Sequence, residues 1–123
     1  MQITREVTDA NVIRAWESGR VRIGDTWFGG NLIVSADTIL RDWIIADPPR
    51  LTIADLAPAL ALEPEIILLG TGIAAPTPDV ELMADVAARS VGLEIMTTPA
   101  ACRTYNVLVH EQRRVCAVLL TAG

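Results

Sequence analysis

Apolar and polar residues alternate in short runs along the first half of the chain. Gly, Ser, Asn and Asp separate these runs, and this pattern predicts strands joined by tight turns. The expected strands cover residues 12–17, 20–23, 26–28, 31–35 and 38–45. The last is expected to stop at Asp47-Pro48-Pro49, because proline cannot donate to a strand ladder. The spacing is typical of antiparallel hairpins.

The second half has a different pattern, in which fully apolar runs alternate with helical segments. The apolar runs predict strands over residues 66–69, 93–96 and 115–120. The intervening segments predict helices over residues 53–61, 79–91 and 100–110. The expected N-caps of these helices are, in order, Thr52, Thr77 and Thr98. Pro78 and Pro99 follow the second and third caps and are expected at first helical positions. Gly92 is expected to end the second helix.

The helix expected over residues 79–91 has an amphipathic pattern. Its apolar face consists of Val80, Met83, Ala84, Ala87 and Val91. Its other face carries Glu81, Asp85 and Arg89, of which the last two are spaced for an i,i+4 ion pair.

The order of these elements predicts the fold class. Apolar strands that bracket a helix are typical of a parallel, right-handed βαβ unit. We therefore expect a three-layer α/β fold with a mixed central sheet, helices packed on it, and an additional antiparallel β layer from the N-terminal half. A length of 123 residues predicts a single domain over residues 1–123.

Charge and composition narrow the function classes. The net charge is −5 and all ten basic residues are arginine, which disfavours nucleic acid as a partner and excludes a Schiff-base lysine. No apolar run approaches the roughly 20 residues that span a membrane, and the N-terminus does not resemble a signal peptide. We therefore expect a cytoplasmic protein. Monomer and homodimer both remain open.

The cysteines and tryptophans give weaker indications of function. Cys102, Cys116 and the single His110 have no disulfide or zinc-ligand spacing, so no metal is expected. The three tryptophans, Trp16, Trp27 and Trp43, all lie in the β-rich half. One or two are expected in the core, and an exposed one would indicate a surface for a partner.

The segment Gly70-Thr71-Gly72-Ile73-Ala74-Ala75 formally matches a dinucleotide-binding loop. Pro76 and Pro78 delay the following helix, which favours the interpretation of a tight turn. This turn and the one at residues 97–99 both follow parallel strands, so both are expected at one edge of the sheet. Thr71, Thr98 and the backbone N–H groups of residues 100–102 are therefore candidates for holding a small anion.

The helix expected over residues 100–110 has two faces. Ala101, Tyr105 and Leu108 are expected in the core, whereas Arg103 and Asn106 share the opposite stripe and are better candidates for function. Two structural alternatives stand beside a functional role. For Arg103, an ion pair with a nearby carboxylate is favoured over a functional role. Asn106 can equally form hydrogen bonds with the backbone of a neighbouring loop.

Cys102 lies in the first turn of this helix. A helix N-terminus and an adjacent arginine both lower the pKa of a thiol. His110 is two turns away on a different face, so the thiol has no base within hydrogen-bond range. Packing is the favoured role for Cys102, and no catalytic residue is predicted.

The stretch from Gly92 to Leu108 resembles a small domain family of unknown biochemical function. Its members include a mitochondrial assembly factor of respiratory complex I and an adipogenesis-associated protein of the Mth type. Further matching stretches are residues 22–24, 28–34, 67–72 and 115–119, with Trp43. Three positions depart from the family pattern: Thr97, where Asp is frequent, Pro99, where Gly is frequent, and Asn31, where Ser is frequent.

The resemblance implies a three-layer α/β fold and no established enzyme activity or cofactor. It favours a protein-interaction or assembly-factor module, and an enzyme is not expected. The alternative is a protein that binds or converts a small anionic ligand. That ligand would lie at the loops of residues 70–72 and 98–103, with Gly70, Thr71, Gly72, Thr98, Cys102, Arg103 and Asn106 as the candidate residues for a ligand or a partner.

Overall fold

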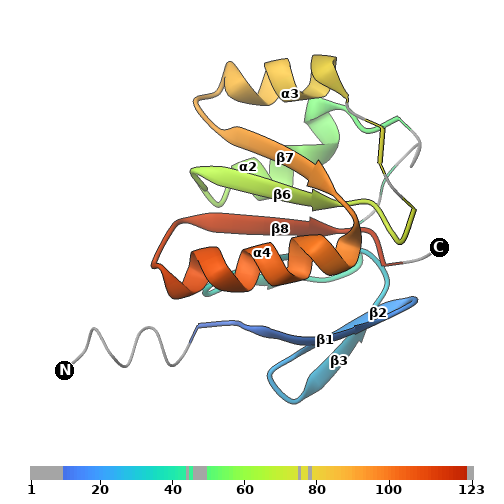
Figure 1. Ribbon diagram of the computed structural model, residues 1–123. Helices are drawn as coiled ribbons and strands as arrows, with labels where there is room; N and C mark the ends of the chain where they lie inside the picture. The colour runs from blue at the N-terminus through green and yellow to red at the C-terminus, as the bar shows by residue number, and fades with distance from the viewer. Residues whose placement is uncertain (1–9, 44, 46–49, 75, 78, 122–123) are drawn as a thin grey trace.

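The computed structural model describes residues 10–43, 45, 50–74, 76–77 and 79–121. Two sheets and the helices packed on them make up this part of the chain (Figure 1). The three-stranded sheet consists of β1 (Ile13–Glu17), β2 (Arg20–Ile23) and β3 (Thr26–Gly29). The five-stranded sheet consists of β4 (Leu32–Ser35), β5 (Ile39–Leu40), β6 (Ile66–Gly70), β7 (Gly92–Met96) and β8 (Val115–Leu119). The helices are η1 (Ile53–Leu56), α2 (Ala57–Leu60), α3 (Val80–Ala87) and α4 (Thr98–His110).

The five-stranded sheet is mixed, with the strand order β5-β4-β8-β6-β7. β6 runs parallel to both β7 and β8, whereas β4 runs antiparallel to β5 and β8. The N-terminal strands β1, β2 and β3 pair antiparallel in a separate sheet. The mixed α/β fold, its parallel β6-α3-β7 unit and the additional antiparallel layer are therefore confirmed.

Each face of the central sheet buries its own apolar cluster. On one face, α4 and the inner side of the three-stranded sheet pack against β4, β6 and β8. On the other face, η1, α2 and α3 pack against the same strands and β7. All residues of β8 are buried, because this strand is central in the sheet and is covered on both sides.

The strand expected over residues 38–45 is much shorter than its sequence pattern indicates. Only Ile39–Leu40 pairs as β5. Asp42 has φ +56°, a left-handed conformation that interrupts the extended chain. Trp43 is buried beyond this point, and its indole N–H donates to the Asp55 carbonyl at 2.9 Å. Ile44 and the segment Asp47-Pro48-Pro49 lie outside the described residues.

Two of the expected helix caps are wrong, because the residue that caps the helix is one or two positions away in the sequence. α4 is capped by Thr97, whose side chain accepts from the Ala100 N–H at 3.4 Å, and Thr98 lies in the first turn. α3 is capped by Asp79, which accepts from the Leu82 N–H at 3.0 Å, rather than by Thr77. The capping box of Thr52 and Asp55 is present, although it opens a 3-10 turn. Pro78 lies outside the described residues.

The end of α3 also differs from its expected position. The helix stops at Ala87, and Ser90 takes a left-handed conformation with φ +63°. Gly92, the expected stop, already belongs to β7. The left-handed turn after α3 therefore falls on Ser90, two residues before the glycine.

Candidate functional site

The loops after β6 and β7 lie side by side, and their polar groups bind one another. The Thr98 N–H donates to the Gly72 carbonyl at 2.8 Å, and the Thr71 N–H donates to the Met96 carbonyl at 2.9 Å. The Thr98 hydroxyl accepts from the Gly72 N–H at 2.8 Å and donates to the Leu120 carbonyl at 2.7 Å. Thr98 is fully buried. Its side chain thus joins the end of β6, the start of α4 and the end of β8.

Gly70 is required by this close packing. A Cβ at Gly70 would lie 2.9 Å from the Thr98 Cα and 3.1 Å from the Ala101 Cβ. The first turn of α4 therefore rests directly on the end of β6. Gly72 takes φ +100°, which only glycine adopts without strain. Both glycines have a structural reason within this junction, and the Gly72 N–H already has a partner in the Thr98 hydroxyl.

The Cys102 thiol lies inside the core between α4 and the central sheet. It is 5% exposed, and burial raises the pKa of Cys102 to about 12, although the neighbouring Arg103 lowers it in part. Cys116 on β8 is also buried, and burial raises its pKa to about 12. Both thiols are therefore protonated at neutral pH, and a thiol is a poor nucleophile in that form.

Asn106 binds the backbone of β1. Its Oδ1 accepts from the Ile13 N–H at 2.9 Å, and its Nδ2 donates to the Ile13 carbonyl at 2.7 Å. One residue earlier on α4, the buried Tyr105 hydroxyl donates to the Asn11 carbonyl at 2.8 Å. Two adjacent side chains of α4 thus hold the start of the three-stranded sheet. Tyr105 was expected in the core, but its partner could not be identified from the sequence.

Arg103 is exposed on α4. Among the carboxylates that the structure describes, none forms an ion pair with it, so the expected structural pairing is not seen there. The seven candidate residues therefore divide into two groups. Gly70, Thr71, Gly72 and Thr98 form the junction of β6 and α4, whereas Cys102, Arg103 and Asn106 lie along α4 and point in different directions.

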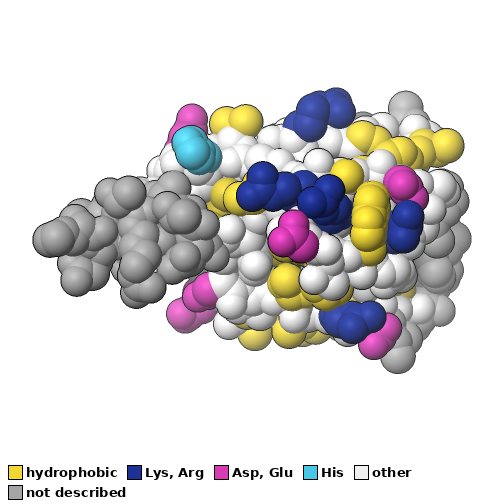
Figure 2. Space-filling model, turned by 90° about the horizontal axis from the view of Figure 1, so that it is seen from below, with side chains coloured by type: hydrophobic (Ala, Val, Ile, Leu, Met, Phe, Trp, Pro, Cys, Tyr) yellow, Lys and Arg dark blue, Asp and Glu magenta, His cyan; other side chains and the backbone are white. Residues whose placement is uncertain are grey.

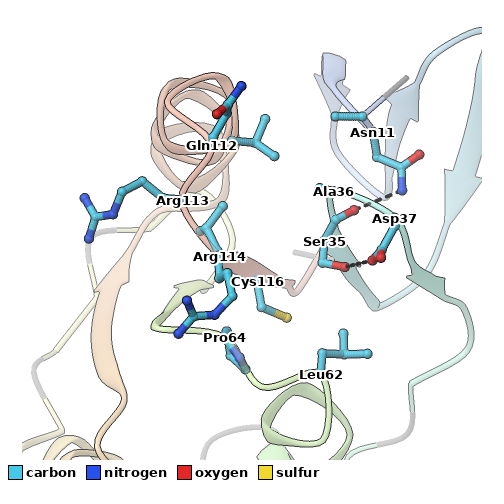
Figure 3. A pocket seen from close by; sticks show the side chains of 13 residues that line it. Asn11, Ser35, Ala36, Asp37, Leu62, Pro64, Gln112, Arg113, Arg114 and Cys116 are labelled. Carbon is cyan, nitrogen blue, oxygen red and sulfur yellow. Dashed lines mark hydrogen bonds between the residues drawn. The ribbon is translucent and has the colours of Figure 1, made fainter. Parts of the chain in front are cut away.

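A cleft of about 870 Å³ lies at the opposite end of α4, where sequence reasoning placed no site (Figure 3). Its walls come from the end of β4, the α2–β6 connection and the turn between α4 and β8. Several polar groups there already have partners within the chain. Ser35 Oγ donates to Asp37 at 3.2 Å, and Arg113 pairs with Glu65 at 3.2 Å. Arg114 Nε donates to the Glu63 carbonyl at 3.3 Å.

The exposed apolar side chains give a clearer functional signal. α3 buries Leu82 and Val86, whereas Val80 is 75% exposed and Met83 is 38% exposed. Ala84 and Ala87 are exposed as well. The apolar face that the amphipathic pattern indicates therefore faces solvent, and only Val91 from that set packs on the core. Leu82 and Val86 are large, branched and four residues apart. They bury more apolar area against the sheet than the face that contains the alanines would.

No group of His, Cys, Asp and Glu among the described residues could hold a metal ion. No helix in the described part of the chain is long and apolar enough to cross a membrane.

Solved structures with closely similar folds come from several bacteria. A Bordetella parapertussis protein is 32% identical, with a TM-score of 0.82 over 91% of this chain and 96% of that chain. A Xanthomonas campestris protein is 34% identical, with a TM-score of 0.80 over 92% of this chain and 86% of that chain. The structure of MT938, at 18% identity and a TM-score of 0.71, covers 93% of this chain and 100% of that chain and shows the same fold.

Curated relatives carry two kinds of name. The "13 kDa major membrane protein" of Francisella tularensis is 31% identical, over 98% of this chain and 99% of the relative. Assembly factor 3 of the NADH dehydrogenase [ubiquinone] 1 alpha subcomplex from Danio rerio is 27% identical, over 94% of this chain and 67% of the relative. The family model described as "Protein of unknown function (DUF498/DUF598)" matches residues 13–120. The chain therefore belongs to the DUF498/DUF598 family, with the Mth938-like fold and complex I assembly factors among its relatives.

Proposed function

We propose that this protein is a non-enzymatic protein-interaction module that acts as an assembly factor. The observation that carries the proposal is the exposed apolar face of α3, formed by Val80, Met83, Ala84 and Ala87. A contiguous exposed apolar surface costs hydration free energy, and in soluble domains it is typical of sites where another protein binds.

The geometry of α3 suits such a role. Val80 and Met83 provide larger contacts, and the two alanines allow a partner backbone to approach closely. Glu81, Asp85 and Arg89 are exposed as well, but they lie on the other face of this segment, so no charged side chain interrupts the apolar face. The core of a protein interface is typically depleted of charged residues. α3 lies at the end of the molecule opposite the three-stranded sheet (Figure 1).

The relatives support the same class of function. The Danio rerio and human proteins are named as assembly factors, and this chain is 27% and 26% identical to them. It spans about two-thirds of the length of each. Assembly of a protein complex requires contacts with protein partners. We extend that requirement to this chain as part of the proposal.

The junction of β6 and α4 offers less support for the anion alternative. Thr98 is fully buried, and its hydroxyl and the Gly72 N–H bind each other. An anion at that point would have to displace the hydrogen bonds by which Thr98 joins the start of α4 to the segments that follow β6 and β8. The buried, protonated Cys102 adds no nucleophile.

The proposal is tested by co-purification of the tagged chain from its native cells, with partners quantified by mass spectrometry. Val80→Glu places a charge in the exposed face of α3. Val107→Glu is the matched control, because Val107 is 57% exposed on a different helix. A glutamate at position 80 also lies in the first turn of α3, where a negative charge is tolerated.

We expect wild type and Val107→Glu to retain the same partner, and Val80→Glu to lose it by about tenfold, as expected for one buried apolar contact replaced by a charge. Equal recovery by all three proteins would contradict the proposal, and so would loss in both variants. Light scattering of the purified proteins shows whether the partner is a second copy of the chain.

A cytoplasmic location forms part of this proposal. Both cysteines are buried and reduced, which suits a reducing compartment. Fractionation of cells that express the chain at its native level tests the location. Recovery in the membrane fraction after a high-salt wash would contradict it.

A further inference from the structure

The outer side of the three-stranded sheet carries an arginine-rich face. β2 buries Val21 and Ile23, so Arg20 and Arg22 project outwards. The register pairs Arg22 with Ala15 on β1 and with Trp27 on β3, which places these residues on the same outer side. Figure 2 views the molecule from this side and shows arginine side chains spread across the middle of the surface.

A β-bulge adds a third arginine to this face. The register between β1 and β2 shifts between Ile13 and Ala15. The residue in the bulge is Arg14, which is exposed, while Ile13 remains buried against the core. A bulge places two residues of one strand opposite one residue of its partner, so Arg14 and Ala15 both lie opposite Arg22. The bulge therefore brings Arg14 beside Arg22.

Two of the arginine side chains, Arg20 and Arg22, are held in position by their neighbours. The Arg20 guanidinium stacks 4.0 Å from the centroid of the Trp27 ring, and its Nε donates to Glu17 at 2.8 Å. Arg22 Nε donates to the Gly24 carbonyl at 3.0 Å, and its Nη2 donates to Asp25 at 3.3 Å. Both of these guanidinium groups keep further N–H donors for a ligand. Such bracing lowers the entropy lost on binding.

The sign of the charge on this face is opposite to that of the whole molecule. Arg14, Arg20 and Arg22 face two carboxylates, Glu17 and Asp25, whereas the chain as a whole has a net charge of −5. The face is also small, since a strand of four residues spans only about 13 Å. A long polyanion or an anionic bilayer would extend past this face and meet the acidic remainder of the molecule. A short acidic segment would not.

We propose that the face formed by Arg14, Arg20, Arg22 and Trp27 binds a short acidic segment of a partner protein. Carboxylates of the segment pair with the outward N–H groups of the guanidinium groups, and its apolar side chains lie against Trp27 and Ala15. Trp27 is half-buried beneath Arg20 rather than projecting, which suits contact with a peptide better than insertion into lipid. The inference does not depend on the α3 face, which lies at the other end of the molecule (Figure 1).

NMR titration of the full chain tests this inference. The probe is a short peptide of alternating Glu and Ala, with a Gln-Ala peptide as the uncharged control. We expect chemical-shift changes at residues 14–17, 20–23 and 26–28 and at the Trp27 indole with the acidic peptide only. Arg14→Gln with Arg22→Gln should weaken binding roughly fivefold, as the loss of two exposed charge pairs implies.

Arg50→Gln with Arg89→Gln is the matched control, because it removes the same charge from exposed positions outside the face. We expect it to retain binding within about twofold, as expected for distant screened charges. An equal loss in both double variants would overturn the inference, since net charge alone would then govern binding. It would also be overturned by shifts located elsewhere, or by tighter binding to phosphatidylserine vesicles or to oligothymidylate than to the peptide.

Discussion

The side-chain amide of Asn106 pairs with both backbone polar groups of Ile13, at 2.9 Å and 2.7 Å. An amide side chain presents one donor and one acceptor in the same spacing as a peptide group. Asn106 therefore completes the outer edge of β1 as a neighbouring strand would. It is the main polar link between α4 and the three-stranded sheet that carries the arginine face.

Asn106→Ala is expected to destabilise the fold by about 2 kcal/mol, because it removes two hydrogen bonds and leaves the Ile13 peptide without a partner. Urea denaturation of both proteins measures the difference. Asn106→Asp keeps the acceptor for the Ile13 N–H but places a carboxylate oxygen against the Ile13 carbonyl, so it should not restore stability. A change in free energy below about 0.5 kcal/mol for the alanine variant would show that water replaces the amide.

Gly70→Ala is expected to lower stability by about 1–3 kcal/mol, the usual cost of overpacking. The added Cβ would meet the Thr98 Cα at 2.9 Å, and a backbone atom in a helix cannot move aside locally. Gly29→Ala is the matched control, since its nearest atom lies at 3.7 Å. Thermal unfolding should show a lower midpoint for the first variant and a nearly unchanged one for the second. Equal midpoints would mean that α4 can shift away from β6.

Thr98→Val keeps the shape of the side chain but removes the hydroxyl. The Gly72 N–H and the Leu120 carbonyl then lose a buried partner, so we expect a loss of about 2–4 kcal/mol. Thr71→Val removes one hydroxyl that binds the Met96 carbonyl at 3.2 Å at a partly exposed position, and it should cost less. The order of the two denaturation midpoints checks this interpretation. Equal costs would contradict the structural role given to Thr98.

The two buried thiols predict a loss of stability in alkaline solution. Burial raises the pKa of Cys102 and of Cys116 to about 12, whereas an unfolded thiol titrates near about 8.5. Between these two pKa values the thiols are protonated in the folded state and ionised in the unfolded state. The free energy of unfolding is therefore unaffected by the thiols below about pH 8.5 and falls as the pH rises towards 12. Burial also raises the pKa of Tyr105, which acts in the same direction.

Urea denaturation between pH 7 and pH 10 measures this alkaline loss. Cys102→Ala should reduce the slope, because one of the raised thiols is then absent. In the folded protein at pH 8, both thiols should react with a disulfide reagent far more slowly than after unfolding. Rapid labelling of Cys102 in the folded protein would instead restore the reactive-thiol interpretation.

Local patterns in the sequence predicted much of the fold because their causes are local. Alternation and turn residues identify β1, β2 and β3 nearly to their ends, and continuous apolar runs identify β6, β7 and β8. β5 is shorter than its apolar run indicates because Asp42 turns the chain and Trp43 packs on η1. The cap of α4 lies one residue earlier than expected because the Thr98 hydroxyl instead binds Gly72, just after β6, and Leu120, just after β8.

The sequence by itself determined the order of the elements, the mixed α/β class, the family and the adjacency of the loops after β6 and β7. These follow from periodicity, turn chemistry and the direction of parallel strands, all of which act over a few residues. Only the tertiary structure decided which side of α3 is buried and where Asn106 finds its partner. These outcomes depend on contacts between residues that lie far apart in the chain, such as Asn106 and Ile13. The surfaces proposed to bind partners also depend on the tertiary structure, because packing of the core determines which side chains remain exposed.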